Sequence, residues 1–311
     1  MYTYTTTQWV LFFLIYCFFG WCIETTFVSC RKRQFVNRGF LTGPVIPIYG
    51  SGAVAILWAT LPVRESWIGV FLLGMAAATL LEYITGAVME ATLKVRYWDY
   101  SDKKCNLHGY ICLNTSLAWG VLSVALVRFV HRPVERLVLS LPEGLSQVLA
   151  LVLSGLFCVD FALSLKAALD LRKLLEQLEA HAQKAREDAR QLQKRLEAAS
   201  AQRREELEAY LARKLPDGGE ALQKRMEAME QAAARLEQSE TVQRLRTDLA
   251  LWRDRRAQAR ENFRQRLTGD KRRLLRGNPS ASSGRYGQQL ALLRQRLAEE
   301  RQERKKRKKQ P

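Results

Sequence analysis

Four carboxylates lie inside or at the ends of long apolar stretches in the first 170 residues: Glu24, Glu82, Glu90 and Asp160. A charge at the centre of a bilayer costs about 2.5–3.5 kcal/mol even on the most lenient insertion scale. Such a group usually faces a partner, a water-filled cavity or a ligand. The pattern predicts an integral membrane protein with a polar interior, and it places the candidate function in that interior.

Charge divides the chain into two halves. Residues 1–165 hold 12 Lys and Arg with 9 Asp and Glu, whereas residues 166–311 hold 37 and 22, so most of the net charge of +18 belongs to the second half. The change near Lys166 predicts a membrane domain over residues 1–169, a cytoplasmic helical region over 170–276 and a basic end over 277–311.

Five segments are long enough to cross about 30 Å of hydrocarbon at 1.5 Å per residue. They run approximately over Trp9–Ser29, Phe40–Leu61, Trp67–Leu93, Ile111–Val130 and Leu145–Leu169. Lys and Arg are concentrated after the first, third and fifth segments, while the N-terminal segment has none. The positive-inside rule predicts an N-terminus outside and a C-terminus in the cytoplasm, with the arginines near Pro133 as the exception.

The second segment begins with LTGPVIPIYGSG, residues 41–52, which is rich in glycine and proline. Proline has no backbone donor and glycine loosens a helix. Irregular backbone at membrane depth is stable only where protein or a watery cavity satisfies it. We expect a broken or re-entrant helix; the alternative is a kinked span that begins nearer Pro47.

Glu82, Gly86 and Glu90 follow one another at intervals of four, so they share one face of a helix. A glycine between two carboxylates lets another backbone approach both. This favours a cation or proton site, or a socket for Arg38 or another basic group. Arg38 could instead pair with Asp99 or with Glu24, and either pair would fix the spans against each other. The alternative is a structural ion pair. The candidate substrate or ion path consists of Glu24, Glu82, Tyr83, Glu90 and Asp160.

Six short motifs occur in a fixed order: FGWCIE (19–24), NRGFLTGPVIPIYG (37–50), LEYITGAVME (81–90), WDYS (98–101), NLHGYICL (106–113) and WG (119–120). As a set they resemble the CmpB-like permeases of the ABC-transporter type IV family over residues 9–165. The motif residues to which the resemblance gives a structural or functional role are Gly20, Trp21, Asn37, Arg38, Gly39, Gly43, Pro44, Pro47, Tyr49, Gly50, Gly86, Trp98, Asp99, Tyr100, Asn106, Gly109 and Trp119.

The resemblance implies a permease component in the inner membrane of a bacterium. An ABC transporter also needs an ATPase with a GxxxxGK[ST] phosphate loop, and this sequence has none. We therefore expect the ATPase to be a separate subunit that docks on cytoplasmic loops such as WDYS. No cofactor or metal is expected, because Cys105, His108 and Cys112 offer only three possible zinc ligands.

The tail beyond residue 170 carries a seven-residue repeat of Leu and Ala over 171–199, the period of a coiled coil. Pro216–Gly219 predicts a turn, and a second patterned stretch follows as far as Phe263. We expect an antiparallel helical hairpin over residues 170–267; a parallel intermolecular coiled coil is the alternative. Either one would serve self-association or the binding of partner helices.

The end of the chain is predicted to be a flexible linker, residues 277–284, and a basic tail. From Lys271 onward there are 14 Lys and Arg against 3 Asp and Glu. Such segments attract anionic lipid with about 1 kcal/mol per basic residue. Anionic lipid is therefore a candidate partner of the tail, next to the bilayer itself; the alternative is a solvated, disordered end.

The expected fold is all-α, a polytopic bundle of about five spans, one of them broken or re-entrant, followed by a coiled-coil hairpin. Three functions fit it. The first is a permease subunit without its own ATPase, the second is a membrane-anchored scaffold whose tail recruits partners, and the third is an intramembrane acid-dependent enzyme. No nucleophile pattern supports the third, so no catalytic residue is assigned and an enzyme is not expected.

Overall fold

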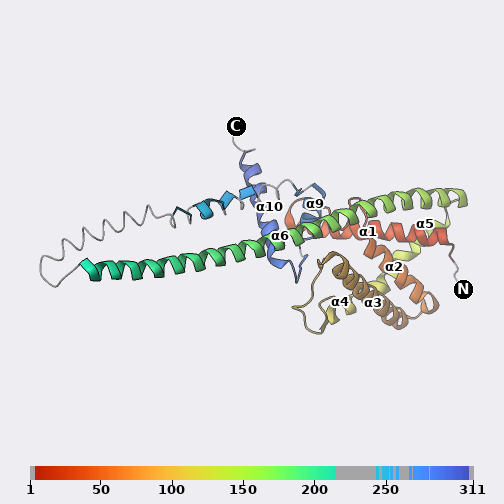
Figure 1. Cartoon of the computed structure of the whole chain (residues 1–311). Coiled ribbons are helices and arrows are strands. Elements are labelled where there is room, and N and C mark those ends of the chain that lie inside the picture. Colours follow the sequence, from red (N-terminus) through yellow and green to blue (C-terminus); the bar gives the residue numbers. More distant parts are fainter. Residues whose placement is uncertain are drawn as a thin grey trace. The chain divides into compact units, whose positions relative to one another are not determined.

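The computed structural model describes residues 4–214, 243–244, 247–251, 253–254, 257–258, 266–267, 269–279 and 281–307. The chain forms two compact units, one of Met1–Glu176 with Thr268–Pro311 and one of Gln177–Leu267. The helices are α1 (Thr6–Lys32), α2 (Pro47–Thr60), α3 (Trp67–Leu93), α4 (Leu113–Ala125), α5 (His131–Leu139), α6 (Glu143–Lys214), α9 (Gly269–Gly277) and α10 (Gly287–Arg307). A 3-10 turn (Leu61–Val63) follows α2, and a π-helical turn (Leu126–Val130) joins α4 to α5 (Figure 1).

Four of these stretches are long and apolar enough to cross a membrane: Thr6–Lys32, Trp67–Leu93, Leu113–Leu139 and Glu143–Arg195. The all-α membrane bundle expected from the sequence is therefore confirmed, and Trp67–Leu93 has the predicted bounds. The predicted span Ile111–Val130 was wrong at both ends. Its first two residues form strand β2 (Ile111–Cys112), which pairs antiparallel with β1 (Asn106–Leu107), and its helix continues through the π-turn to Leu139.

The second apolar segment is shorter than a span. Helix α2 has 14 residues, which gives it a length of about 21 Å at 1.5 Å per residue. Pro47 occupies the first turn, where a missing backbone N–H is harmless. The preceding residues 40–46 are not helical. The helix therefore begins at Pro47, where the alternative placed it, and the first half of the predicted span is an irregular stretch and not one half of a broken helix.

Helices α1 to α4 pack in sequence order, α1 on α2, α2 on α3 and α3 on α4. The contact of α1 with α2 depends on Gly50. A Cβ atom there would lie 2.3 Å from Cys17 Sγ and 2.5 Å from the carbonyl oxygen of Phe13. The centre of the bundle is filled by buried apolar side chains such as Phe12 and Leu57.

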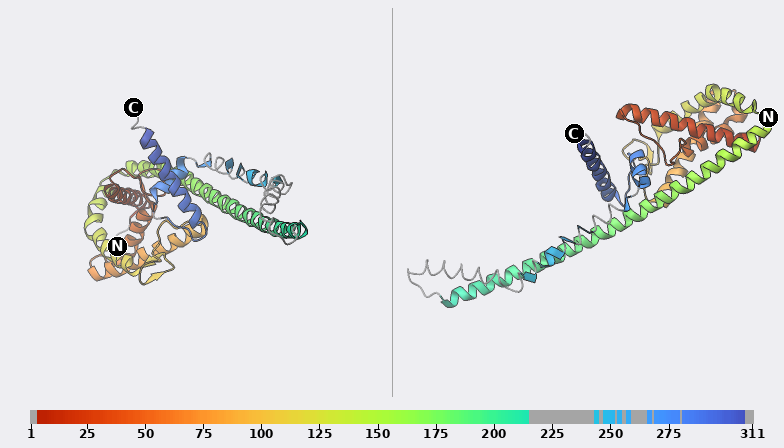
Figure 2. Two further views of the ribbon diagram at one scale, coloured as in Figure 1. Left: turned by 90° about the vertical axis from the view of Figure 1, so that its left-hand side faces the viewer. Right: turned by 90° about the horizontal axis from the view of Figure 1, so that it is seen from above.

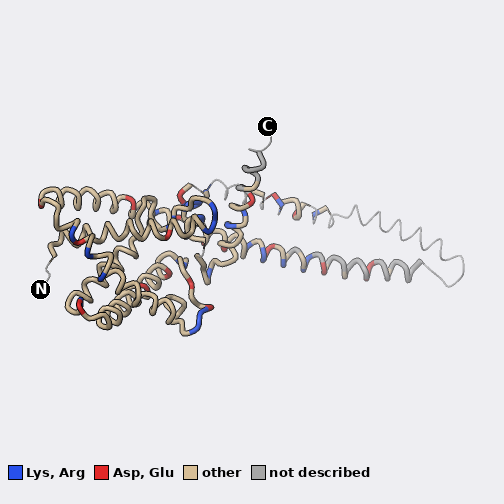
Figure 3. Tube along the Cα trace, turned by 180° about the vertical axis from the view of Figure 1, so that it is seen from behind, with Lys and Arg blue, Asp and Glu red and all other residues tan. Residues whose placement is uncertain are grey.

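The outward faces of the bundle are apolar as well, which is typical of helices in contact with lipid. Large side chains that are mostly exposed include Ile23, Ile68, Leu80, Val121 and Leu151. Charged residues are sparse along these helices and gather near the chain segments at their ends (Figure 3).

The second unit contains two segments that run in opposite directions. Arg195 Nη1 lies 3.4 Å from Asp248 Oδ2, and Arg266 Nη1 donates to Gln177 Oε1 at 2.6 Å. The chain advances by the same 18 residues from 177 to 195 and from 248 to 266, so the two contacts share one antiparallel register. This is the arrangement that the hairpin requires. The predicted turn Pro216–Gly219 and the apolar positions between 222 and 236 lie outside the described residues, and coiled-coil packing stays a prediction.

The segment after the hairpin belongs to the membrane unit. In Figure 1 and in the right-hand view of Figure 2, α9 lies beside the C-terminal end of α1. Leu274 of α9 packs into an apolar cluster with Leu93 and Ala168. Within the stretch expected to be a flexible linker (277–284), Gly277, Ser282 and Ser283 instead form hydrogen bonds with the loops of this unit.

Candidate functional site: a carboxylate network

Glu24 lies on the last turns of α1 and has two partners. Arg38 Nε donates to its Oε2 at 3.2 Å, and the Tyr49 hydroxyl donates to its Oε1 at 2.9 Å. The Tyr49 ring reaches this position because Gly20 has no side chain; a Cβ there would lie 2.3 Å from Tyr49 Cγ. Of the two pairings considered for Arg38, the structure has the one with Glu24.

Glu82 is the most buried of the four carboxylates, with 6% of the residue exposed. Its Oε1 accepts a hydrogen bond from the Tyr100 hydroxyl at 3.2 Å and its Oε2 accepts one from Trp119 Nε1 at 2.9 Å. Both donors are neutral. Within the part of the chain that the structure describes, no cation is paired with this carboxylate.

Glu90 lies two turns further along the same face of α3. Its Oε2 accepts from Arg96 Nε at 2.7 Å and from the Tyr110 hydroxyl at 2.5 Å. The Tyr110 ring packs over Gly86, where a Cβ would lie 3.1 Å from its Cδ1. The spacing of Glu82, Gly86 and Glu90 therefore leaves room for the Tyr110 ring between the two carboxylates, and the two carboxylates have different partners.

Asp99 anchors the loop that follows α3. It accepts from the backbone and hydroxyl of Ser101 at 3.0 and 2.6 Å and from the Ser282 hydroxyl at 3.0 Å, and Arg96 Nη1 lies 3.7 Å from its Oδ1. Burial raises the pKa of Asp99, but these hydrogen bonds and the charge of Arg96 outweigh it, so the pKa lies below its usual range. The ionised carboxylate thus stabilises the loop.

The same loop is closed by the β1–β2 hairpin. Trp98 Nε1 donates to the Tyr110 carbonyl at 2.9 Å, and Asn106 Nδ2 donates to the Lys103 carbonyl at 2.8 Å. Gly109 has a φ of +75°, a left-handed conformation that favours glycine. These contacts place Tyr100 and Tyr110 over α3, where they reach Glu82 and Glu90.

Asp160 does not belong to this network. From α6 it accepts backbone hydrogen bonds from Thr42 at 3.0 Å and Gly43 at 2.7 Å, and the Ser164 hydroxyl donates to it at 3.2 Å. It satisfies backbone donors of the irregular stretch before α2, as membrane-depth backbone requires. In this structure Asp160 caps that backbone and shares none of these hydrogen-bond partners with Glu82.

The remaining motif residues shape the same region. Trp21 Nε1 donates to Asn37 Oδ1 at 2.6 Å, and Asn37 Nδ2 donates to the Thr42 carbonyl at 2.8 Å. Gly39 has a φ of +112° and Pro44 is exposed. Tyr83 faces His108, with its hydroxyl 3.2 Å from Nδ1, so it lies beside the network and not on Glu82.

We call this group of side chains the carboxylate network: Glu24, Arg38, Tyr49, Glu82, Glu90, Arg96, Tyr100, Tyr110 and Trp119. The Tyr49 and Trp119 rings, 6.4 Å apart, connect the Glu24 side to the Glu82 side. An apolar groove of about 460 Å³ lies between α1 and α2, is lined by Trp9, Phe13 and Trp58 among others, and includes none of these side chains. The described residues contain no group of three His, Cys, Asp or Glu side chains arranged to hold a metal.

A second polar cluster was not predicted from the sequence. His131 is 1% exposed, with Nδ1 2.9 Å from the Tyr16 hydroxyl and Nε2 3.2 Å from the Tyr4 hydroxyl. Tyr4 donates to Glu135, whose other oxygen is 3.2 Å from Arg64 Nη2. Because the single Tyr4 proton is given to Glu135, Nε2 carries the imidazole proton and Nδ1 accepts from Tyr16. We call these five residues the histidine cluster.

A bundle of apolar helices with partnered carboxylates in its interior defines a polytopic membrane protein. Residues 11–165 match the model of the family described as Putative ABC-transporter type IV, and this part of the chain belongs to that family, as its motifs indicated. The carboxylate network, from Glu24 to Trp119, lies entirely inside the match. No curated protein and no solved structure is significantly similar to the chain.

Proposed function

We propose that the membrane unit is a permease subunit of an ABC-type transporter and that the carboxylate network is part of its substrate or ion path. The observation that carries the proposal is the environment of Glu82. A carboxylate with two neutral donors and no paired cation has an uncompensated charge in a medium where charge is costly. In the proposal, the charge of Glu82 is therefore neutralised by a proton or by a bound cation, and either of these can be exchanged.

Glu24 and Glu90 differ from Glu82 because each holds an arginine, at 3.2 and 2.7 Å. These pairs fix the irregular stretch and the loop after α3 around Glu82. Both pairs are partly exposed, with about a quarter of each side chain accessible, so each pair adds only modestly to stability. In the proposal they form the frame of the site, and Glu82 is its working group.

Energy comes from a separate ATPase subunit in this proposal, since the sequence has no phosphate loop. Its docking surface is the loop after α3, residues 94–105, which carries Lys94, Lys103 and Lys104. Tyr100 of this loop donates a hydrogen bond to Glu82, so a movement of the loop on ATPase binding would be transmitted to Glu82 through Tyr100. We place this face in the cytoplasm of a bacterial cell, in agreement with the positive-inside rule.

Glu82→Gln tests the working group. Dicyclohexylcarbodiimide reacts with protonated carboxyl groups in apolar surroundings, and we expect it to label Glu82 in the full-length protein but not the Gln variant. Glu143→Gln, at the start of α6, is the matched control and should keep the label. An unlabelled Glu82 in the folded protein would contradict the proposal.

The partner is tested on the same two variants. An ATPase should co-purify from the native membrane with full-length protein, and Glu82→Gln should keep the complex while reducing its ATP hydrolysis. A complex that never contains an ATPase, or hydrolysis that is unchanged by Glu82→Gln, would refute the permease role.

Orientation is tested with native thiols. Cys30 and Cys105 are exposed at the same end of the bundle as Glu90. A membrane-impermeant maleimide should label them in inside-out vesicles and not in intact spheroplasts. The opposite pattern would place the C-terminus outside.

A membrane-anchored scaffold is the second candidate, favoured by the antiparallel register of the second unit. Arg266 contacts Gln177, so the two ends of this unit meet and a short Gly-Ser linker can replace residues 178–265. A permease should keep ATPase coupling after this replacement, whereas a scaffold should lose its partners. The intramembrane enzyme stays a prediction, for which Glu82→Gln would abolish turnover of a lipid-like substrate.

A further inference from the structure

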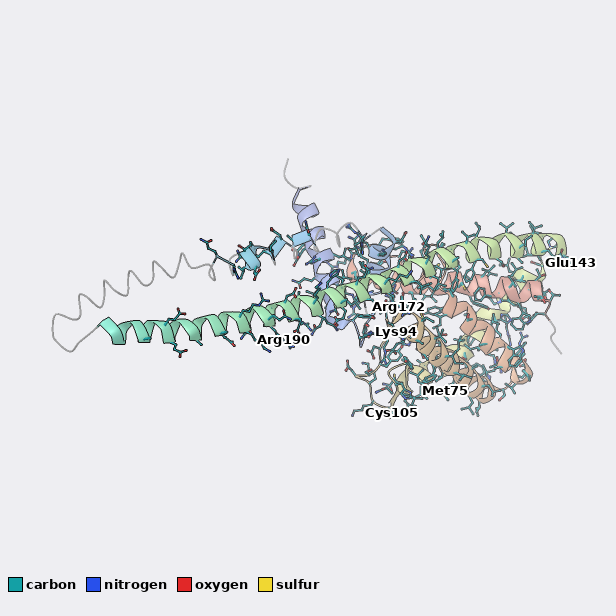
Figure 4. All side chains as sticks on the ribbon, viewed as in Figure 1. Met75, Lys94, Cys105, Glu143, Arg172 and Arg190 are labelled. Atoms are coloured by element: carbon teal, nitrogen blue, oxygen red, sulfur yellow. The ribbon has the colours of Figure 1, made fainter. Side chains whose placement is uncertain are left out.

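The C-terminal residues 273–279 and 281–286 contact the loops that follow α1 and α3 and the middle of α6, close to the carboxylate network. Arg273 Nη1 donates to the Leu41 carbonyl at 2.6 Å, and its Nη2 lies 3.3 Å from the Ser164 hydroxyl. Arg172 of α6 donates to the Thr92 carbonyl at 2.7 Å. Figure 4 shows Lys94 and Arg172 at the same end of the unit, with Glu143 at the other.

Two contacts connect this segment to arginines of the network. Arg38 donates through Nε to Glu24 and through Nη1 to the Gly277 carbonyl at 2.7 Å. Arg96 donates to Glu90 through its side chain, while its backbone forms two hydrogen bonds of 2.8 Å with Ser282 in an antiparallel bridge. Each arginine therefore touches a membrane carboxylate on one side and the C-terminal segment on the other.

The loop after α3 is further tied to this segment by two hydroxyl groups. Ser282 Oγ donates to Asp99 at 3.0 Å and Ser283 Oγ donates to the Lys94 carbonyl at 2.7 Å. The loop to which we assign ATPase docking is thus already occupied by residues of the same chain.

Two guanidinium groups are partly buried at the docked segment, Arg273 within it and Arg294 on α10, and no carboxylate is paired with either among the described residues. Arg294 donates to the carbonyls of Asn278 and Ala281, and burial lowers its pKa. The Nε atoms of Arg273 and Arg294 are buried without a hydrogen-bond partner. Guanidinium groups held by neutral acceptors keep much of their desolvation cost. The apolar contact of Leu274 opposes this cost, so docking is a balance that a competing partner can shift.

We propose that residues 273–286 are a releasable latch, which holds Arg38 and Arg96 on Glu24 and Glu90 and occupies the docking loop until a cytoplasmic partner displaces it. The latch follows directly on the returning segment of the hairpin, so a partner bound to the hairpin can pull on it through the chain. This inference concerns regulation of the same site and rests on the proposed function only for what the site does when it is released.

A pair of glycines gives matched variants. A Cβ atom at Gly277 would lie 2.9 Å from the backbone oxygen of Asn37, whereas one at Gly284 meets nothing within 4 Å. Gly277→Ala should therefore lift the latch, and Gly284→Ala should leave it in place. Ser282→Pro removes the backbone donor to Arg96, while Ser282→Ala removes only the hydroxyl, which gives a second pair on the opposite side of the latch.

The readout is amide hydrogen exchange of residues 94–101 in the full-length protein in lipid nanodiscs. Released backbone groups exchange through local opening, and we expect about tenfold faster exchange in Gly277→Ala and Ser282→Pro than in their partners Gly284→Ala and Ser282→Ala. Equal exchange within both pairs, with all four proteins folded, would overturn the latch.

Coupling to the site needs a second readout on the same proteins. Carbodiimide labelling of Glu24 and Glu90 should rise severalfold in the two latch-lifting variants, because their arginines are then no longer held. Faster exchange with unchanged labelling would overturn the regulatory role. Neither result depends on transport. The permease proposal fails if no ATPase co-purifies, whereas the latch fails on the exchange or labelling results, so the two failures can be told apart.

Discussion

The carboxylate network and the histidine cluster stand near opposite ends of the membrane helices and differ in how their charges are held. In the network, two carboxylates carry arginines and Glu82 has only neutral donors. In the histidine cluster the one carboxylate, Glu135, carries an arginine, and a neutral imidazole bridges two tyrosines. The one carboxylate of the cluster has its countercharge within the cluster, whereas among the described residues Glu82 of the network has no paired cation.

The largest expected effect is on the packing that positions the network. Gly50→Ala places a Cβ atom 2.5 Å from a backbone oxygen of α1, and we expect a loss of about 3 kcal/mol in the free energy of unfolding, since overpacked cores rarely relax fully. Urea unfolding in detergent measures it. Gly155→Ala, with open space around it, is the control and should be neutral or stabilising. An equal loss in both variants would mean that the close approach of α1 and α2 is unimportant.

A substitution in the histidine cluster should cause a smaller loss. His131→Phe removes the acceptor of the buried Tyr16 hydroxyl, which should cost about 2 kcal/mol of unfolding free energy. Adding Tyr16→Phe should recover part of this loss, because both partners are then apolar. ATP hydrolysis of the complex should not change beyond the loss of folded protein. A specific loss of hydrolysis would give the histidine cluster a working role and break the comparison.

Removal of one network arginine should be milder. Arg38 and Glu24 are partly exposed, with 19% and 29% of their side chains accessible, so we expect Arg38→Met to cost about 1 kcal/mol. The double variant Glu24→Gln/Arg38→Met measures the coupling between them through a thermodynamic cycle. If the losses of the two single variants add up to the loss of the double variant, Arg38 and Glu24 have no coupling energy. Glu24 would then, like Glu82, lack an effective countercharge.

The smallest effect is a pH dependence. The pKa of Asp99 is lower in the folded protein than in the unfolded chain, so its contribution is fully present above the unfolded pKa and is lost as the pH falls through the folded pKa. The protection of amides 94–101 against exchange, measured relative to the intrinsic exchange rate at each pH, should therefore fall below about pH 4. Asp99→Asn should remove this dependence. The same acid response in Asp99→Asn would assign it to another group.

Much of the network could be predicted from the sequence because its carboxylates interrupt long apolar runs. Glu24, Glu82 and Glu90 are conspicuous there, and the bounds of α3 followed from hydropathy alone. The partners were harder to predict. Arg96 looks like any basic loop residue, and its position on Glu90 depends on the β1–β2 hairpin, whose two-residue strands leave almost no periodic signal.

The histidine cluster could not be predicted for a related reason. Tyr4, Tyr16 and His131 are each unremarkable, and the residues that meet are up to 131 positions apart. The docking of residues 277–284 was missed because Gly, Ser and Pro in sequence indicate flexibility, while the backbone groups that those residues leave accessible are what the loops bind. The local composition of a segment cannot predict a hydrogen bond to a residue more than 180 positions away.

The cap that Asp160 places on the backbone of Thr42 and Gly43 has a consequence for biogenesis. During synthesis the irregular stretch before α2 emerges from the ribosome well before Asp160 has been made, since 117 residues separate Gly43 from its acceptor. Until α6 is inserted, those amides must stay at the wet surface or be shielded by the insertion machinery. The second apolar segment would then settle only after α6 is inserted, and the nascent chain between these two events would be exposed to quality-control proteolysis.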